Sequence, residues 1–98
     1  MLDGPDNVTM TPRGALIVCE DGGQAVQRLI TISAAGQPTL FARNAVRLDG
    51  ERNGISGDYR DKEFAGACFS PDGRWLFVNV QTPGVSFAIT GPWEKLGL

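Results

Sequence analysis

Acidic and amide side chains lie at the ends of short apolar segments of this chain. Asp6 and Asn7 lead into the first segment, and Glu20 and Asp21 close the second. Glu63 leads into a later one. Carboxylate and amide oxygens are hard ligands, suited to calcium or magnesium, and to ferric iron where carboxylates dominate. Acidic residues at strand ends are also commonly just solvated, and the spacing does not match an EF-hand loop, so the pattern alone leaves metal binding open.

The composition excludes several other kinds of site. The 98 residues include no histidine, the commonest general base and transition-metal ligand. A net charge of -2 without a basic stripe excludes a nucleic-acid groove, and no apolar run is long enough to span a membrane. Cys19 and Cys68 fit neither a zinc spacing nor a disulfide framework, so both are predicted to pack as buried thiols.

The elements that must position these residues are strands. Apolar alternation between turn signals predicts seven strands, at residues 7–11, 15–20, 28–33, 38–43, 64–70, 75–81 and 85–90. A polar stretch, residues 44–62, separates the fourth strand from the fifth and shows no sustained period. It is too long for an ordinary connection, so we expect it to be poorly ordered or to loop outward. The core is predicted to contain the following residues: Leu16, Val18, Leu29, Ile30, Phe69, Leu76 and Val78.

The two groups of strands repeat one another. "MTPRGALIV" from Met10 aligns with "FSPDGRWLFV" from Phe69 when one residue is inserted at Arg74. A meander that recurs with the same turn chemistry is typical of β-propeller blades, and two similar hairpins of a small β-sandwich are the alternative. We predict an all-β chain of two propeller-like blades, about residues 7–43 and 63–93, joined by the insertion at 44–62. Two blades do not close a propeller, so the chain is expected to be a fragment of a larger one, or to self-associate through open blade edges.

The stretch "EFAGACFSPDGRWLFVNVQTPG" from Glu63 combines a carboxylate with two unusual strand residues, Asn79 and Gln81. On a strand these amides share a face with Trp75 and Phe77. They are predicted to line a central channel beneath Glu63; the alternative is that they satisfy backbone groups at a strand end.

Several motifs together resemble the C-terminal part of the PhoX-type alkaline phosphatases, secreted bacterial β-propeller enzymes. The motifs are Pro5-Asp-Asn, Cys19-Glu-Asp, Glu63-Phe-Ala-Gly, the strand from Leu76 to Gln81 and Ile89-Thr-Gly-Pro-Trp, and the resemblance runs from Asp3 to Trp93. It implies a phosphomonoesterase whose active site holds iron and calcium, ligated mainly by carboxylates.

Carried over to this sequence, the resemblance makes Glu20 and Glu63 metal ligands, with Asp6, Asn7 and Asp21 as further candidates and Cys19 below them. It implies calcium and iron as cofactors of the full-length family, a phosphate monoester as substrate, and a periplasmic or secreted location, although this chain carries no export signal. Further ligands would come from other blades, so the chain alone is expected to bind no metal and to be inactive. Three arginines of the insertion could orient phosphate oxygens or remain solvated: Arg47, Arg52 and Arg60.

Two other functions fit the same residues. One is a calcium-dependent lactonase-like propeller enzyme, which also uses carboxylate and amide ligands. The other is a non-catalytic interaction domain of propeller type. Iron with calcium in the purified protein would favour the phosphatase, calcium alone the lactonase, and neither metal the interaction domain.

Overall fold

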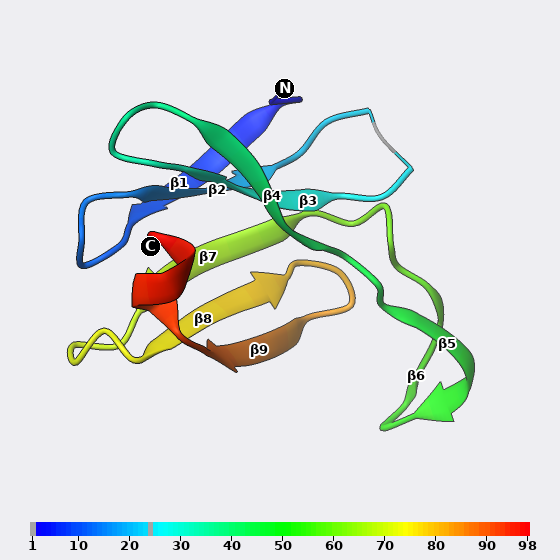
Figure 1. Cartoon of the computed structure of the whole chain (residues 1–98). Coiled ribbons are helices and arrows are strands. Elements are labelled where there is room, and N and C mark those ends of the chain that lie inside the picture. The colour runs from blue at the N-terminus through cyan, green and yellow to red at the C-terminus, as the bar shows by residue number, and fades with distance from the viewer. Residues whose placement is uncertain (1, 24) are drawn as a thin grey trace.

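A computed structural model describes residues 2–23 and 25–98 of the chain. The described residues form strands and one short 3-10 helix (Figure 1). The elements are β1 (Pro5–Met10), β2 (Leu16–Glu20), β3 (Arg28–Ile32), β4 (Pro38–Arg43), β5 (Arg47–Arg52), β6 (Ile55–Asp58), β7 (Phe64–Phe69), β8 (Trp75–Val80), β9 (Val85–Thr90) and η1 (Trp93–Leu96). No helix in this part of the chain is long and apolar enough to cross a membrane.

The strands form three antiparallel sheets. β1-β2-β3-β4 is a four-stranded meander and β7-β8-β9 a three-stranded one, and the two lie against each other through β1, β2 and β7 (Figure 1). β5 and β6 pair as a separate hairpin. The predicted all-β chain of antiparallel meanders is therefore confirmed.

The repeated turn seen in the sequence has the same hydrogen bonds in both copies. The Gly14 N–H donates to the Thr11 carbonyl at 3.0 Å, and the Gly73 N–H donates to the Ser70 carbonyl at 2.9 Å. In each copy the hydroxyl also accepts from the backbone at the start of the next strand, at 3.1 Å. Both glycines have positive φ, +89° and +72°, which explains why the motif ends in glycine.

The core fills the space between the two meanders. Its buried apolar residues include Ile17, Cys19, Leu29, Phe64, Leu76, Val78, Val80 and Trp93. The predicted core positions Leu29, Leu76 and Val78 are confirmed. Phe69 is half-buried and packs its ring edge-on against Trp93, with centroids 5.4 Å apart.

The remaining predicted core residues are on the other face of the first sheet. Val18 and Ile30 are buried, and Leu16 is half-buried, but none belongs to the cluster between the meanders. β2 and β3 are apolar on both faces, so alternation could not reveal which face turns inward.

The polar insertion forms the β5–β6 hairpin and projects away from both meanders (Figure 1). No strand was predicted in residues 44–62, because this stretch shows no sustained apolar alternation. Asn44 anchors its base: its side-chain amide donates to the carbonyls of Tyr59 and Lys62 at 2.6 and 2.8 Å and accepts from the Val46 N–H at 2.9 Å. Asn44 is only 2% exposed, so these partners replace the water that it gives up.

Cys68 corrects one prediction. Cys19 is buried as expected, but Cys68 is exposed, and both are free thiols. The pairing of β7 with β8 shifts register between Ala65 and Cys68, around Gly66 at φ +63°. This bulge places Cys68 opposite Phe77, on the face that points away from the core.

Candidate metal centre

Three carboxylates from separate segments meet where β1, β2 and β7 adjoin. Asp6 lies in a register shift of β1, Asp21 directly follows β2, and Glu63 directly precedes β7. One oxygen from each of the three lies within 4.8 Å of the other two. Asp6 and Asp21 are exposed and Glu63 is half-buried, so the cluster is open to solvent on one side.

The backbone around the cluster tolerates no side chain at Gly4. The Asp21 N–H donates to the Gly4 carbonyl at 2.7 Å, and this closes the chain entering β1 onto the end of β2. Gly4 has φ +63°, and a Cβ there would lie 2.5 Å from the Asp21 carbonyl oxygen. Glycine therefore lets Asp21 sit beside the start of β1, close to Asp6.

The cluster is electrostatically strained without a counter-ion. Burial raises the pKa of Glu63 above its ordinary value, and a hydrogen bond with the Asp6 carboxyl and the charges of Asp21 and Asp6 raise it further. Glu63 therefore keeps its proton to a higher pH than an isolated glutamate does. A bound cation would relieve the same repulsion.

The geometry fits a hard cation. Two oxygens that each lie about 2.4 Å from one calcium ion can be at most about 4.8 Å apart, and no two of the three cluster oxygens lie farther apart than that. One oxygen from each of the three carboxylates gives three ligands, fewer than the six to eight oxygens that calcium usually takes. The cluster is thus an incomplete site to which water, substrate or other protein groups would contribute.

Glu20 has a different environment from the cluster. Its carboxylate accepts from the Arg28 guanidinium at 2.7 and 3.1 Å and from the Asp3 N–H at 2.5 Å. The Glu20 side chain is 1% exposed. Burial alone would raise the pKa of Glu20, but these hydrogen bonds lower it overall. The structure therefore brings Asp21, rather than its neighbour Glu20, to Glu63.

Asn7 and Cys19 face each other across β1 and β2, next to the cluster. Asn7 is exposed and follows Asp6 in the chain. Burial raises the pKa of the Cys19 thiol to about 11; the charges of Asp6 and Glu63 add to this, while a hydrogen bond with the Ala67 backbone opposes it. The Cys19 thiol is thus protonated and lies near the carboxylates. In the sequence, the only indication of this proximity is that Cys19 comes two residues before Asp21.

The unusual amide of β8 supports the bulge in β7. The Asn79 amide donates to the Ala65 carbonyl at 3.1 Å and accepts from the Ser86 hydroxyl at 2.5 Å. A Cβ at Gly66 would lie 2.8 Å from the Asn79 amide nitrogen. The Gln81 N–H donates to the Glu63 carbonyl at 3.0 Å, which fixes the chain just before β7. Both residues thus hold backbone groups around Glu63.

The candidate phosphate-binding arginines are on the β5–β6 hairpin and its return. Arg60 is held by Asp58 through contacts of 2.7 and 2.9 Å. Arg47 lies 3.8 Å from Asp49, and Arg52 is exposed. The local carboxylates compete with any phosphate for Arg47 and Arg60.

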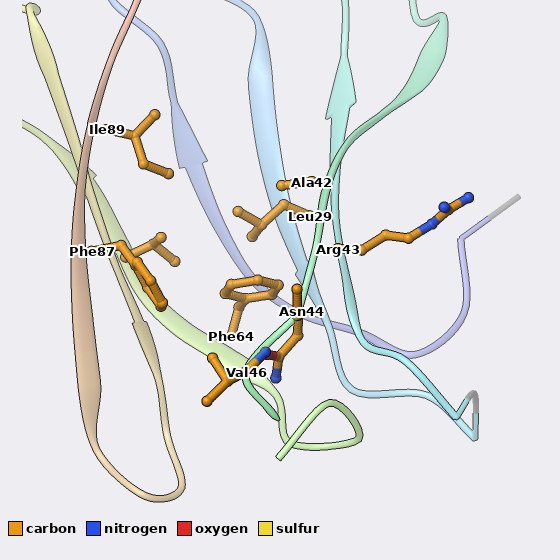
Figure 2. A pocket seen from close by; sticks show the side chains of 10 residues that line it. Leu29, Ala42, Arg43, Asn44, Val46, Phe64, Phe87 and Ile89 are labelled. Carbon is orange, nitrogen blue, oxygen red and sulfur yellow. The ribbon is translucent and has the colours of Figure 1, made fainter. Parts of the chain in front are cut away.

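The structure also contains an apolar groove of about 270 Å³ between the end of β4 and β9 (Figure 2). Its labelled lining includes Leu29, Phe64, Phe87 and Ile89, while Arg43 points away from these side chains. No carboxylate among the described residues lines this groove, so the candidate cation site is the cluster of Asp6, Asp21 and Glu63.

The protein is therefore an all-β protein of antiparallel meanders in which carboxylate oxygens meet at strand ends and form a candidate cation site. The family of alkaline phosphatase PhoX matches residues 1–84, and the chain belongs to this family. Neither the curated proteins nor the solved structures include a significant match.

Proposed function

We propose that this chain forms part of a metal-dependent phosphomonoesterase and that Asp6, Asp21 and Glu63 supply part of its cation site. Membership of the PhoX family supports the reaction class. The meeting of three carboxylates within 4.8 Å is the observation that carries the site. Other ligands would come from outside this segment, as would the remaining catalytic groups.

Each carboxylate has a distinct part in this proposal. Glu63, the least exposed of the three, is held by the backbone contact of Gln81 and is the anchoring ligand. Asp6 and Asp21 are exposed and leave a side open toward which a phosphate could approach. A bound calcium or iron ion would neutralise phosphate oxygens and lower the pKa of a coordinated water so that it can attack the phosphorus in line.

Glu20 has a positioning role in this scheme. Its ion pair with Arg28 and its bond to the Asp3 N–H fix the ends of β2 and of the segment before β1. Asp21 directly follows β2, and Asp6 lies at the start of β1, just after the segment that contains Asp3. Glu20 thereby keeps two of the three cluster residues in place.

The test is Glu63→Gln in a longer protein that contains this segment. The amide keeps the shape of the side chain but removes its charge. We expect bound metal and hydrolysis of p-nitrophenyl phosphate to fall together while the circular dichroism spectrum is unchanged. Glu94→Gln, at an exposed residue paired with Arg13, is the matched control and should leave both intact. Full metal content in the Glu63→Gln protein would refute the assignment.

A further inference from the structure

A buried glutamine closes the loop between β2 and β3. Gln27 is only 3% exposed. Its side-chain amide donates to the Gly22 carbonyl at 2.9 Å and accepts from the Gly22 N–H at 3.2 Å. Gln27 thus pairs with both backbone groups of Gly22, as a neighbouring strand would. Because Gly22 directly follows Asp21, this contact restrains the backbone next to one carboxylate of the cluster.

A second buried amide lies directly after β4. The Asn44 side chain donates to the carbonyls of Tyr59 and Lys62, as described for the base of the β5–β6 hairpin. Lys62 directly precedes Glu63. The contact of 2.8 Å with the Lys62 carbonyl therefore restrains the backbone next to another carboxylate of the cluster.

The two amides are joined to each other through the backbone. The Asn44 N–H donates to the Gln27 carbonyl at 2.8 Å, and the Gln27 N–H donates to the Arg60 carbonyl at 2.9 Å. The hydrogen bonds form a continuous path from Gly22, through both buried amides, to Lys62. We call this path the amide bridge. It joins the end of β2, in the first meander, to the start of β7, in the second.

We propose that the amide bridge sets the distance between the carboxylates of Asp21 and Glu63. Gln27 and Asn44 are then positioning residues, a role that rests on the cation site proposed above. Carboxylates that repel one another need such a restraint to stay within reach of one cation. Polar groups that support metal ligands from outside the coordination shell typically change metal affinity by about 10- to 100-fold when they are removed.

The exposure of Asp21 explains why its backbone matters. Its side chain is exposed, so packing does not fix the carboxylate and its place depends on the chain on either side. On one side the Asp21 N–H donates to the Gly4 carbonyl, and on the other Gly22 is held by Gln27. Water does not compete for the partners of the buried Gln27 and Asn44 amides, which makes the restraint stiff. The base of the β5–β6 hairpin thus contributes to cation binding through its backbone.

Calorimetric titration with calcium, in a longer protein that contains this segment, tests the amide bridge. We expect Gln27→Ala and Asn44→Ala each to raise the calcium dissociation constant about tenfold. The two amides act in series, so the double variant should lose no more than the larger single effect, whereas independent contributions would multiply. The measurement is made well below the unfolding temperature, where a loss of stability alone does not change the dissociation constant.

Thr31→Val is the matched control for these variants. Thr31 is buried in β3, and its hydroxyl donates to the Thr39 carbonyl at 3.2 Å, within the first meander and outside the amide bridge. Valine keeps the shape of the side chain and removes this hydrogen bond. The Thr31→Val protein should bind calcium like wild type.

Hydrogen exchange of the metal-free proteins gives a second readout that does not depend on a cation. Asn44→Ala should speed exchange of the Asp21 N–H, and Gln27→Ala should speed exchange of the Gln81 N–H, which donates to the Glu63 carbonyl. Each of these amides lies beyond the far end of the amide bridge from the substituted side chain. Thr31→Val should leave both rates unchanged.

The outcomes separate the amide bridge from the cation site itself. If wild type and every variant fail to bind calcium while exchange changes as expected, the cation site is wrong and the amide bridge stands. If wild type binds calcium and Glu63→Gln does not, an unchanged dissociation constant in Gln27→Ala or Asn44→Ala would overturn the bridge. Exchange that changes only beside the substituted residue, or losses that multiply in the double variant, would also overturn it. If an alanine variant fails to fold, Gln27→Met and Asn44→Leu, which keep the bulk of the side chain without its amide, replace them.

Discussion

Two glutamates that are alike in sequence should respond in opposite ways to the same substitution. Glu20 is 1% exposed and paired with Arg28, so Glu20→Gln loses charge-assisted hydrogen bonds. Such bonds are worth about 1.5–3 kcal/mol, and Arg28, 22% exposed, recovers some hydration. A loss near the middle of that range lowers the Tm by roughly 10 °C in a domain of this size. Glu63→Gln should instead raise the Tm of the metal-free protein at neutral pH.

The sign for Glu63 follows from its pKa. The folded state raises this pKa, so folding takes up protons and the metal-free protein loses stability as pH rises from below the ordinary value of 4.5 through the raised one. Glu63→Gln cannot lose a proton and escapes that loss. The folded state lowers the pKa of Glu20, so its contribution is present above the ordinary value and disappears as the pH falls through the lowered one.

Thermal unfolding of the three proteins from pH 8 down to about pH 2, in the presence of a chelator, measures both effects, because the contribution of Glu20 is lost only below its ordinary pKa. Glu63→Gln should match wild type at the acidic end and exceed it at the alkaline end. Glu20→Gln should be the less stable protein at pH 8 and approach wild type on acidification. A Glu63→Gln protein less stable than wild type at pH 8 would show that the carboxylates do not repel one another, and the cation argument would lose its basis.

Three further expectations concern the scaffold. Leu76→Ala should cost about 2–5 kcal/mol of unfolding free energy by urea titration, because Leu76 is fully buried in the core, and a neutral result would contradict that packing. Asn44→Ala should cost about 2–3 kcal/mol and speed hydrogen exchange at the base of the β5–β6 hairpin, since three hydrogen bonds disappear; unchanged exchange would refute the anchoring role. Maleimide at pH 8 should modify Cys68 and spare Cys19, whose pKa is about 11, as mass spectrometry of the digested protein would show; equal labelling would contradict the burial of Cys19.

The sequence predicted the strands of the two meanders well because recognisable turn residues separate them, whereas β5 and β6 were not predicted. The repeat at Met10 and Phe69 carries the hydroxyl and the glycine that its hydrogen bonds need, and both copies fold alike. The exposure of Cys68 was not predicted. A bulge moves every later residue of the strand to the opposite face, and a single glycine such as Gly66 is not enough to predict a bulge from sequence.

The sequence predicted the type of ligand in the candidate site, but only some of the residues that form it. Asp6, Asp21 and Glu63 were recognisable as hard ligands at strand ends, and the structure brings them together. Glu20 and Asp21 are adjacent in sequence and both acidic. Only the position of Arg28, on the neighbouring strand, shows that Glu20 is held in an ion pair. Long-range pairing of this kind has no local sequence signal.

The most direct test of the cation site is the calcium dependence of thermal unfolding in a longer protein that contains this segment, compared between its wild-type and Glu63→Gln forms. At about 10 mM calcium, above the roughly millimolar dissociation constants of weak calcium sites, ligand binding should raise the wild-type Tm. Glu63→Gln should show no rise, while Glu94→Gln should respond like wild type. Equal shifts in wild-type and Glu63→Gln protein, or no shift in either, would contradict the assignment of Asp6, Asp21 and Glu63 as a cation site.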